Sequence, residues 1–277
     1  MAYLENNITV GKNQSRQLVI LDDSGHLRSN EEQCDIVMEE NSALELYRIQ
    51  NLNDDSELTT HINIKQARNS RVHFVIVTFN SGWVKNNINV NLDGEGADIQ
   101  IYGLYILDKK QHVENLMKIN HNVPNCSSNE KFKGILDDEA SAVFNGHVMV
   151  APNAQKTNAY QNNSNIILTD KAKINTMPFL EIYADDVKCS HGTSTGQLDQ
   201  DAMFYMRQRG IKKEDARMLL MYAFAAEISN NIKIESVHDS IDDMIKRRLK
   251  GELSSCDTCI FQCSNTEKVF KIDLDKI

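Results

Sequence analysis

Cys189 and His191 stand two positions apart in the stretch ADDVKCSHGTSTGQLD, residues 184–199. If the strand through EIYADDVKCSH stays extended, both side chains project to the same side. A thiolate and an imidazole together suit iron, zinc or an iron–sulfur unit. Tetrahedral coordination needs about four donors, so this pair requires ligands from elsewhere in the chain or from a second protein. The structural alternative is more common for an isolated pair, namely a buried cysteine beside a strand-end histidine.

The residues that flank this pair indicate no further chemistry. Asp185 and Asp186 could act on a metal or as acid and base, but two adjacent aspartates more often form a solvated corner. The segment GTSTG, residues 192–196, lacks the lysine of a phosphate-binding loop and is typical of a turn leading to Asp199. Dinucleotide-binding glycine patterns and H-E-x-x-H zinc motifs are absent from the sequence. The sequence therefore predicts no catalytic or cofactor-binding residue.

The tail contains a second set of candidate metal ligands, Cys256, Cys259 and Cys263 in CDTCIFQC. C-x-x-C spacing can chelate zinc or part of an iron–sulfur cluster, and the third cysteine strengthens that interpretation. A fourth ligand is not evident in the flanking residues. Metal binding here competes with the plainer interpretation of a mobile tail with incidental thiols.

Composition limits the partners and the compartment. The net charge is −9, with 30 Lys and Arg against 39 Asp and Glu, so neither nucleic acid nor an anionic membrane surface is an expected partner. The first residues have no signal-peptide pattern, and no apolar run reaches the ~20 residues that cross a bilayer. We therefore expect a cytoplasmic protein whose six cysteines are mostly reduced.

Short runs with period-two alternation extend from about residue 17 to about residue 187 and predict strands. They include QLVILDD, ELTTHINIKQ, RVHFVIVTF and DIQIYGLYIL, and clusters such as LNDDSE and YQNNSN separate them. This pattern fits a β-sandwich or an irregular solenoid, since no strict repeat is present. The lack of glycine-centred hairpin turns and the Asn-rich QNNSN segment, similar to stacked solenoid corners, favour the solenoid.

Helical spacing replaces this alternation after His191. Asp199 predicts the cap of a helix ending near Arg209, with Gly210 as its stop. Further helices are predicted over about 213–230 and 237–249. The centre of the second, MLLMYAFAAEI, is apolar around most of its circumference, so it packs against the end of the β region or docks another subunit.

Two long runs resemble the SufB/SufD family, the scaffold components of the SUF iron–sulfur cluster assembly system. They are LEIYADDVKCSHGTSTGQLDQDAMFYMRQRGIKKEDARMLLMYAFAAEI and FKGILDDEASAVFNGHVMVAPNAQKTNAYQNNSNIILTD, residues 180–228 and 132–170. Within the family, ADDVKCSHG is similar to the SufD branch. The resemblance implies a right-handed parallel β-helix followed by a small helical domain. We therefore expect a β-helix core at 1–196 and a helical domain docking the ATPase subunit at 197–253, followed by a cysteine-containing tail at 254–277.

The resemblance also implies a non-catalytic scaffold that pairs with a SufB-like subunit and binds a SufC-like ATPase. His191 and Cys189 match the histidine and cysteine of an interfacial cluster-assembly site. No cofactor would be bound stably by the chain alone: the iron–sulfur cluster would be transient at the SufB interface, and ATP would enter only through SufC. In isolation the chain could form a homodimer. The segment that matches the SufC-docking region includes Leu219, Leu220, Tyr222, Ala223 and Phe224.

Two features depart from the family pattern. Members usually begin with a longer helical region, whereas this chain enters strands within its first twenty residues, and the CDTCIFQC tail is not part of the pattern. Two other functions compete with the scaffold. A β-helix carbohydrate-active enzyme would need grouped carboxylates and aromatic platforms, yet aromatics are 6% of residues with a single Trp, Trp83. A self-sufficient metal carrier would use the tail cysteines.

Overall fold

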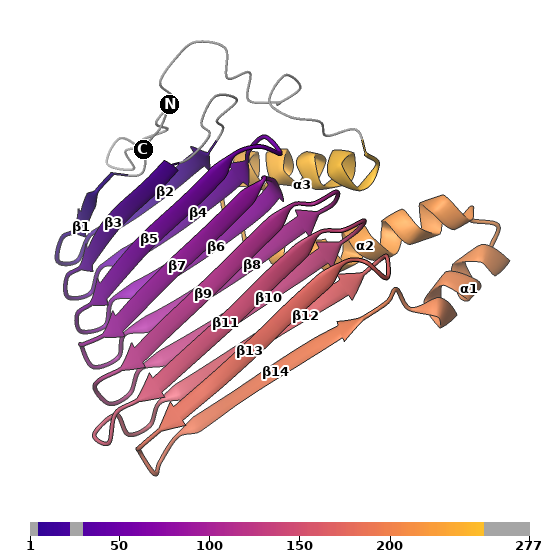
Figure 1. The fold of residues 1–277 in the computed structure, drawn as a ribbon. Helices are drawn as coiled ribbons and strands as arrows, with labels where there is room; N and C mark the ends of the chain where they lie inside the picture. The colour runs from indigo at the N-terminus through magenta and orange to yellow at the C-terminus, as the bar shows by residue number, and fades with distance from the viewer. Residues whose placement is uncertain (1–4, 23–29, 252–277) are drawn as a thin grey trace.

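The computed structural model describes residues 5–22 and 30–251, which contain fourteen strands and three helices (Figure 1). The odd-numbered strands form one seven-stranded sheet: β1 (Asn7–Val10), β3 (Asn30–Met38), β5 (Glu57–Gln66), β7 (Trp83–Leu92), β9 (His112–His121), β11 (Ser141–Val150) and β13 (Lys173–Ile182). The even-numbered strands form the other: β2 (Ser15–Asp22), β4 (Ala43–Asn51), β6 (Arg71–Asn80), β8 (Asp98–Leu107), β10 (Ser127–Leu136), β12 (Asn158–Ile167) and β14 (Lys188–Gly196).

Every strand pairing between these neighbours is parallel, as for β8 with β10 and β9 with β11. Because successive strands alternate between the two sheets, the chain winds as a β-solenoid, and the predicted solenoid is confirmed over the sandwich. Side chains that point between the sheets form one long core, which includes Ile62, Ile101, Phe132 and Phe144. The period-two alternation of the sequence therefore separates the interior from the surface of the coil.

The Asn-rich segment QNNSN was expected at a corner, and this prediction is wrong. Residues 161–165 lie within β12, where Gln161, Asn163 and Asn165 are buried. The stacked asparagines lie instead at the corners that precede β2, β4 and β6: the Asn41 side-chain amide donates to Asn13, and that of Asn69 donates to Asn41. These corner asparagines adopt positive φ, from 54° to 59°, a conformation that asparagine tolerates better than most residues.

The helices are α1 (Gln200–Gln208), α2 (Lys213–Ser229) and α3 (Glu235–Leu249). The Asp199 side chain accepts from the backbone of Asp201 and Ala202, and Gly210 follows with φ of 85°, so the predicted cap and stop are confirmed. Among the residues that the structure describes, no helix is long and apolar enough to cross a membrane.

α2 and α3 pack across the outer face of the even-numbered sheet and not against the end of the solenoid (Figure 1). A second hydrophobic core joins them to that face; it includes Val75, Val77, Phe79 and Leu104 from strands and Met221, Ala225, Ile228, Ile241 and Met244 from helices. Ion pairs flank it, with Lys131 and Lys133 on Glu227 at 2.7 and 2.6 Å. The apolar centre of α2 thus has a partner within this chain along one side.

Candidate functional site

Cys189 and His191 lie on β14, the last strand of the even-numbered sheet. The stretch EIYADDVKCSH is not one strand: β13 ends at Ile182, residues 183–187 form a corner, and β14 begins at Lys188. Asp185 and Asp186 therefore occupy that exposed corner. Cys189 and His191 still share one strand, so the predicted common orientation holds. GTSTG was expected as a turn, which is wrong, because these residues continue β14 to Gly196.

Cys189 faces the interior of the solenoid. It is paired in register with Ala159 of β12, is half-buried and packs against the main core. Burial raises the pKa of the Cys189 thiol, and a hydrogen bond from the backbone of Ala159 partly opposes that rise. A thiol of this kind stays protonated near neutral pH until a metal or a cationic partner arrives.

His191 follows on the same side of the strand, paired in register with Gln161, which is itself buried in the interior. The His191 residue is exposed because β14 has a neighbouring strand, β12, on one side only within the described chain. Its ring has no hydrogen-bond or ion-pair partner among residues 5–22 and 30–251. The ring is therefore free to bind a metal or a partner group.

The pair is an incomplete ligand set. Within the part of the chain that the structure describes, no group of three or more His, Cys, Asp or Glu side chains is placed to hold a metal ion. A thiol and an imidazole at an open edge can supply two donors, and a tetrahedral site needs about four. The three tail residues Cys256, Cys259 and Cys263 lie outside the described residues.

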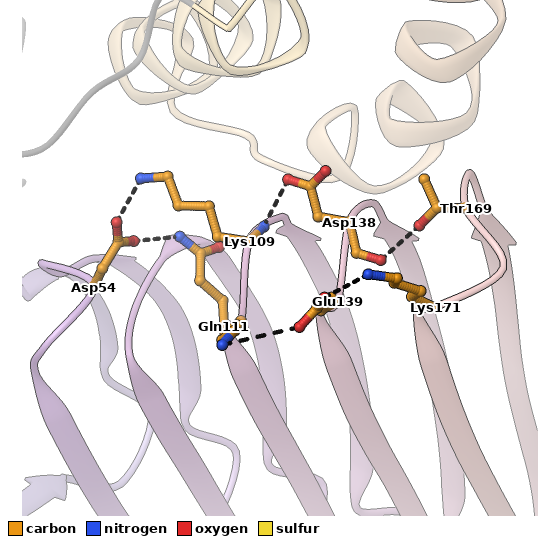
Figure 2. A pocket seen from close by; sticks show the side chains of 8 residues that line it. Asp54, Lys109, Gln111, Asp138, Glu139, Thr169 and Lys171 are labelled. Atoms are coloured by element: carbon orange, nitrogen blue, oxygen red, sulfur yellow. Dashed lines mark hydrogen bonds and ion pairs between the residues drawn. The ribbon is translucent and has the colours of Figure 1, made fainter.

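A separate pocket of about 600 Å³ lies at the corners where even-numbered strands end (Figure 2). Charged and polar groups that line it are paired with one another: Lys171 contacts Glu139 at 2.8 Å, and Asp54 contacts Lys109 and accepts from the Gln111 amide at 2.6 Å. Cys189 is near the start of β14, at the opposite end of the strands. The pocket does not contain the sequence-predicted ligands.

The five predicted docking residues divide between two environments. Leu219 and Ala223 are exposed, and Leu220 is half-buried. Tyr222 and Phe224 pack at the rim of the helix–sheet core, where Tyr222 donates to Asp242 and the Lys133 ammonium lies 4.0 Å from the centre of the Phe224 ring. The surface available to another protein is therefore the outer side of α2, around Leu219 and Ala223.

Sequence reasoning missed an apolar group on the last coil. Met177, Phe179, Ile182 and Tyr183 are exposed on and directly after β13, and Phe179 packs edge-on against His147 with ring centres 5.1 Å apart. The signal was present in the run MPFLEIY, whose apolar residues occupy both faces of the strand. A strand that is apolar on both faces is typical of one covered on both sides.

Comparison with known proteins identifies the relatives of this chain. The family model described as "SUF system FeS cluster assembly, SufBD core domain" matches residues 1–224. The iron–sulfur cluster assembly protein SufD of Escherichia coli strain K12 is 38% identical over 168 residues, which cover 61% of this chain and 40% of that protein.

Two further relatives are iron–sulfur cluster assembly SufBD family proteins. One, from Synechocystis, is 36% identical over 225 residues, covering 81% of this chain and 47% of the relative. The other, from Mycobacterium leprae, is 32% identical over 191 residues, covering 66% and 49%. The chain thus spans about half or less of the length of the relatives it matches. With the core-domain match and the solenoid fold, these similarities show that the chain belongs to the SufBD family of iron–sulfur cluster assembly proteins and is SufD-like.

Proposed function

We propose that this chain is a non-catalytic scaffold subunit that pairs with a SufB-like subunit and binds a SufC-like ATPase. The observation that carries the proposal is the open end of the solenoid. β13 and β14 each have a strand neighbour on one side only within the described residues, and β14 carries Cys189 and His191. This end presents both an edge for a partner and half of a ligand set.

The edge favours a protein partner on physical grounds. An unpaired parallel strand exposes a row of backbone N–H and C=O groups that readily pair with another chain. The exposed Met177, Phe179 and Tyr183 beside it are the kind of apolar surface that a partner covers. A SufB-like subunit at this edge would add the missing donors beside His191. The iron–sulfur cluster is then a transient cargo built at the junction, and a homodimer through the same edge is the state we expect when that partner is absent.

The helical segment is proposed as the docking region for the ATPase, with residues 197–253 as a functional unit distinct from the core at 1–196. The exposed outer side of α2 around Leu219 and Ala223 supports this assignment. ATP would reach the complex only through the SufC-like subunit. Its hydrolysis can move the scaffold subunits only if the ATPase binds two scaffold arrangements with different affinities. We propose the cytoplasm as the compartment of this work, as the sequence predicts.

The first test is co-expression with SufB and SufC partners, anaerobic purification, and measurement of iron and acid-labile sulfide. We expect His191→Ala to leave the complex intact and to lose most of both, because one of the two donors on β14 is gone. His61→Ala is the matched control, since His61 is also a surface histidine on a strand but lies on β5. Unchanged cluster content in His191→Ala would contradict the site, and failure of the wild type to join any complex would contradict the function.

The second test separates ATPase docking from cluster chemistry. Ala223→Arg places a long charged side chain on the exposed side of α2 without disturbing its buried side. We expect the SufC-like subunit to be lost from the purified complex while the SufB-like subunit remains. Ser236→Arg on α3 is the control at another exposed helical position. If both variants retain the SufC-like subunit equally, the docking surface does not include the exposed side of α2.

A further inference from the structure

An interior line of polar side chains ends at His191. Glu130 on β10, Gln161 on β12 and His191 on β14 occupy the same register position on three neighbouring strands. Glu130 is 0% exposed and Gln161 is 2% exposed, so two polar groups are buried behind the exposed histidine. Polar groups buried at this depth lower the stability of a core unless their hydrogen bonds are satisfied. A function of Glu130 and Gln161 would explain why polar residues occupy these positions.

The geometry fixes which end of the Gln161 amide meets Glu130. The Gln161 Nε2 atom lies 3.2 Å from both carboxyl oxygens of Glu130. The other end of the amide, Gln161 Oε1, is buried and has no hydrogen-bond partner among the described residues. A buried carbonyl oxygen without a donor lowers the stability of the folded state, because it has lost its hydrogen bonds to water. Gln161 therefore holds an unused acceptor at the position next to His191 in the register.

The opposite sheet is shaped to admit this side chain. A Cβ atom at Gly146 of β11 would lie 1.9 Å from Gln161 Nε2 and 2.5 Å from its Cδ. Any other residue at position 146 would displace the amide, so the absence of a side chain there creates the seat in which Gln161 lies. The amide is thus held from one side by Glu130 and enclosed from the other by Gly146.

We propose that Gln161 is a positioning residue for the assembly site: the ring of His191, which makes no hydrogen bond in the structure described, turns to donate to the free Oε1 atom of Gln161. This inference rests on the proposed function, in which His191 is a ligand. A metal-binding histidine commonly donates its second ring N–H to a carbonyl or carboxylate, which fixes the tautomer and the ring orientation. With one ring nitrogen donating to Gln161, the other presents its lone pair toward the open end of the solenoid.

Glu130 has a distinct part in this arrangement, because it keeps the Gln161 amide from turning over. A reversed amide would present its NH₂ group to His191 and could no longer accept a hydrogen bond from the ring. When Glu130 is protonated, its carbonyl oxygen still accepts from Nε2, whereas its O–H group could pair only with a reversed amide, which would leave the His191 ring without an acceptor. In Glu130→Gln the new amide offers its carbonyl oxygen to Nε2, so the arrangement in which Gln161 Oε1 faces the ring is retained.

The test uses ¹⁵N-histidine labelling of the full chain, with the His191 signals identified by their loss in His191→Asn, together with iron and acid-labile sulfide content of the co-expressed complex. In the wild type we expect one ring tautomer for His191. Gln161→Leu should give a mixture of tautomers and at least about a tenfold lower cluster content, the scale of the effect of losing an outer partner of a metal ligand. Glu130→Gln should behave as wild type. Asn162→Ala is the matched control, since Asn162 lies on the same strand but is exposed.

The outcomes separate this inference from the proposed function. If Gln161→Leu leaves both tautomer and cluster content unchanged while His191→Ala loses the cluster, the inference is wrong and the site stands. If His191→Ala also keeps the cluster, the proposed assembly site at His191 is wrong, and failure of the wild type to join any complex would contradict the function itself. Should Gln161→Leu fold poorly with Glu130 left unpartnered, the double variant Glu130→Leu/Gln161→Leu removes both polar groups and carries the same expectation. Wild-type behaviour of a folded double variant would likewise overturn the inference.

Discussion

Phe132 on β10 and Cys189 on β14 both point into the solenoid, but they meet different surroundings. β10 has strand neighbours on both sides, and Phe132 is fully buried against Phe144 with ring centres 5.0 Å apart. β14 has a neighbour on one side within the described residues, and Cys189 is half-buried. An inward position in the middle of the solenoid therefore contributes to the core, whereas the same kind of position in the last coil remains accessible for chemistry.

The corners show the same contrast. A residue with positive φ precedes each even-numbered strand from β2 to β12: Asn13, Asn41, Asn69, Gly96, Asn125 and Lys156. The corner that leads into β14 has no residue of this kind. In the inner coils, repeated corner geometry lets each coil stack on the next. The corner before β14 does not need a residue with positive φ, because no described coil stacks on it.

The largest expected effect compares truncations in the two regions. Phe132→Ala should lower the free energy of unfolding by about 3–5 kcal/mol, because it leaves a cavity in a close-packed core. Cys189→Ala should lower it by less than about 1 kcal/mol, because the thiol has packing on one side only. Urea denaturation of the two variants measures both. Similar losses would mean that the last coil is as closely packed as the middle one.

The second prediction concerns pH. Burial raises the pKa of Glu130 to about 8, and the hydrogen bond from Gln161 partly opposes that rise. In the unfolded chain this carboxyl ionises near its ordinary value of 4.5, so the folded state loses stability as pH rises from 4.5 towards 8. Glu130→Gln has no such carboxyl and therefore no such loss. The free energy of unfolding of the variant minus that of the wild type should accordingly be about 3 kcal/mol larger at pH 7 than at pH 4.5. Unfolding free energies at both pH values measure it, and a pH-independent difference would contradict the prediction.

Much of the fold follows from local pattern. Alternation predicted the strands around Ile62 and Ile101, and Asp199 and Gly210 predicted the ends of α1, because each signal depends on a few neighbouring residues. The QNNSN segment was misplaced for a long-range reason: buried polar residues in β12 are compatible with the interior only through partners such as Tyr105, which lies about two strands away. The polarity of a short stretch of sequence does not indicate whether such partners exist on distant strands.

The site was only partly predictable. Spacing indicated that Cys189 and His191 project together, and a family resemblance pointed to their role. The Gln161–Glu130 pair could not be inferred, since 31 positions separate the two residues in the sequence and only the register of β10 and β12 joins them. The exposure of β14 likewise could not be predicted from a short stretch of sequence, because it depends on β14 being the last strand of its sheet.

The third prediction tests the corners of the inner coils. Asn41 has φ of 59°, and its side chain bridges Asn13 and Asn69 at 3.0 and 3.2 Å. Asn41→Ala should cost about 1–2 kcal/mol of stability, because alanine is strained in the left-handed conformation. Asn41→Gly keeps the backbone relaxed and loses only the exposed amide bonds, so it should cost less. Thermal unfolding of both variants measures the two losses of stability. Equal losses would mean that the hydrogen bonds of the Asn41 side chain, and not its backbone conformation, account for the stabilisation.

The smallest effect on stability is expected at Phe179, which is 56% exposed on the last coil. Phe179→Asp should change the free energy of unfolding by no more than about 0.5 kcal/mol, because its ring has little packing to lose within the chain. If the open end is where a second subunit binds, the same change should weaken self-association of the isolated chain, because it places a charge in a surface that pairing would bury. Sedimentation velocity over a range of concentrations measures this association, with Trp83→Asp as a matched control, since Trp83 is also an exposed aromatic residue but lies on β7. A larger loss of association in Trp83→Asp would mean that the chains associate through the odd-numbered sheet and not through the last coil. The open end of the solenoid would then not be the binding surface that distinguishes the last coil from the middle coils.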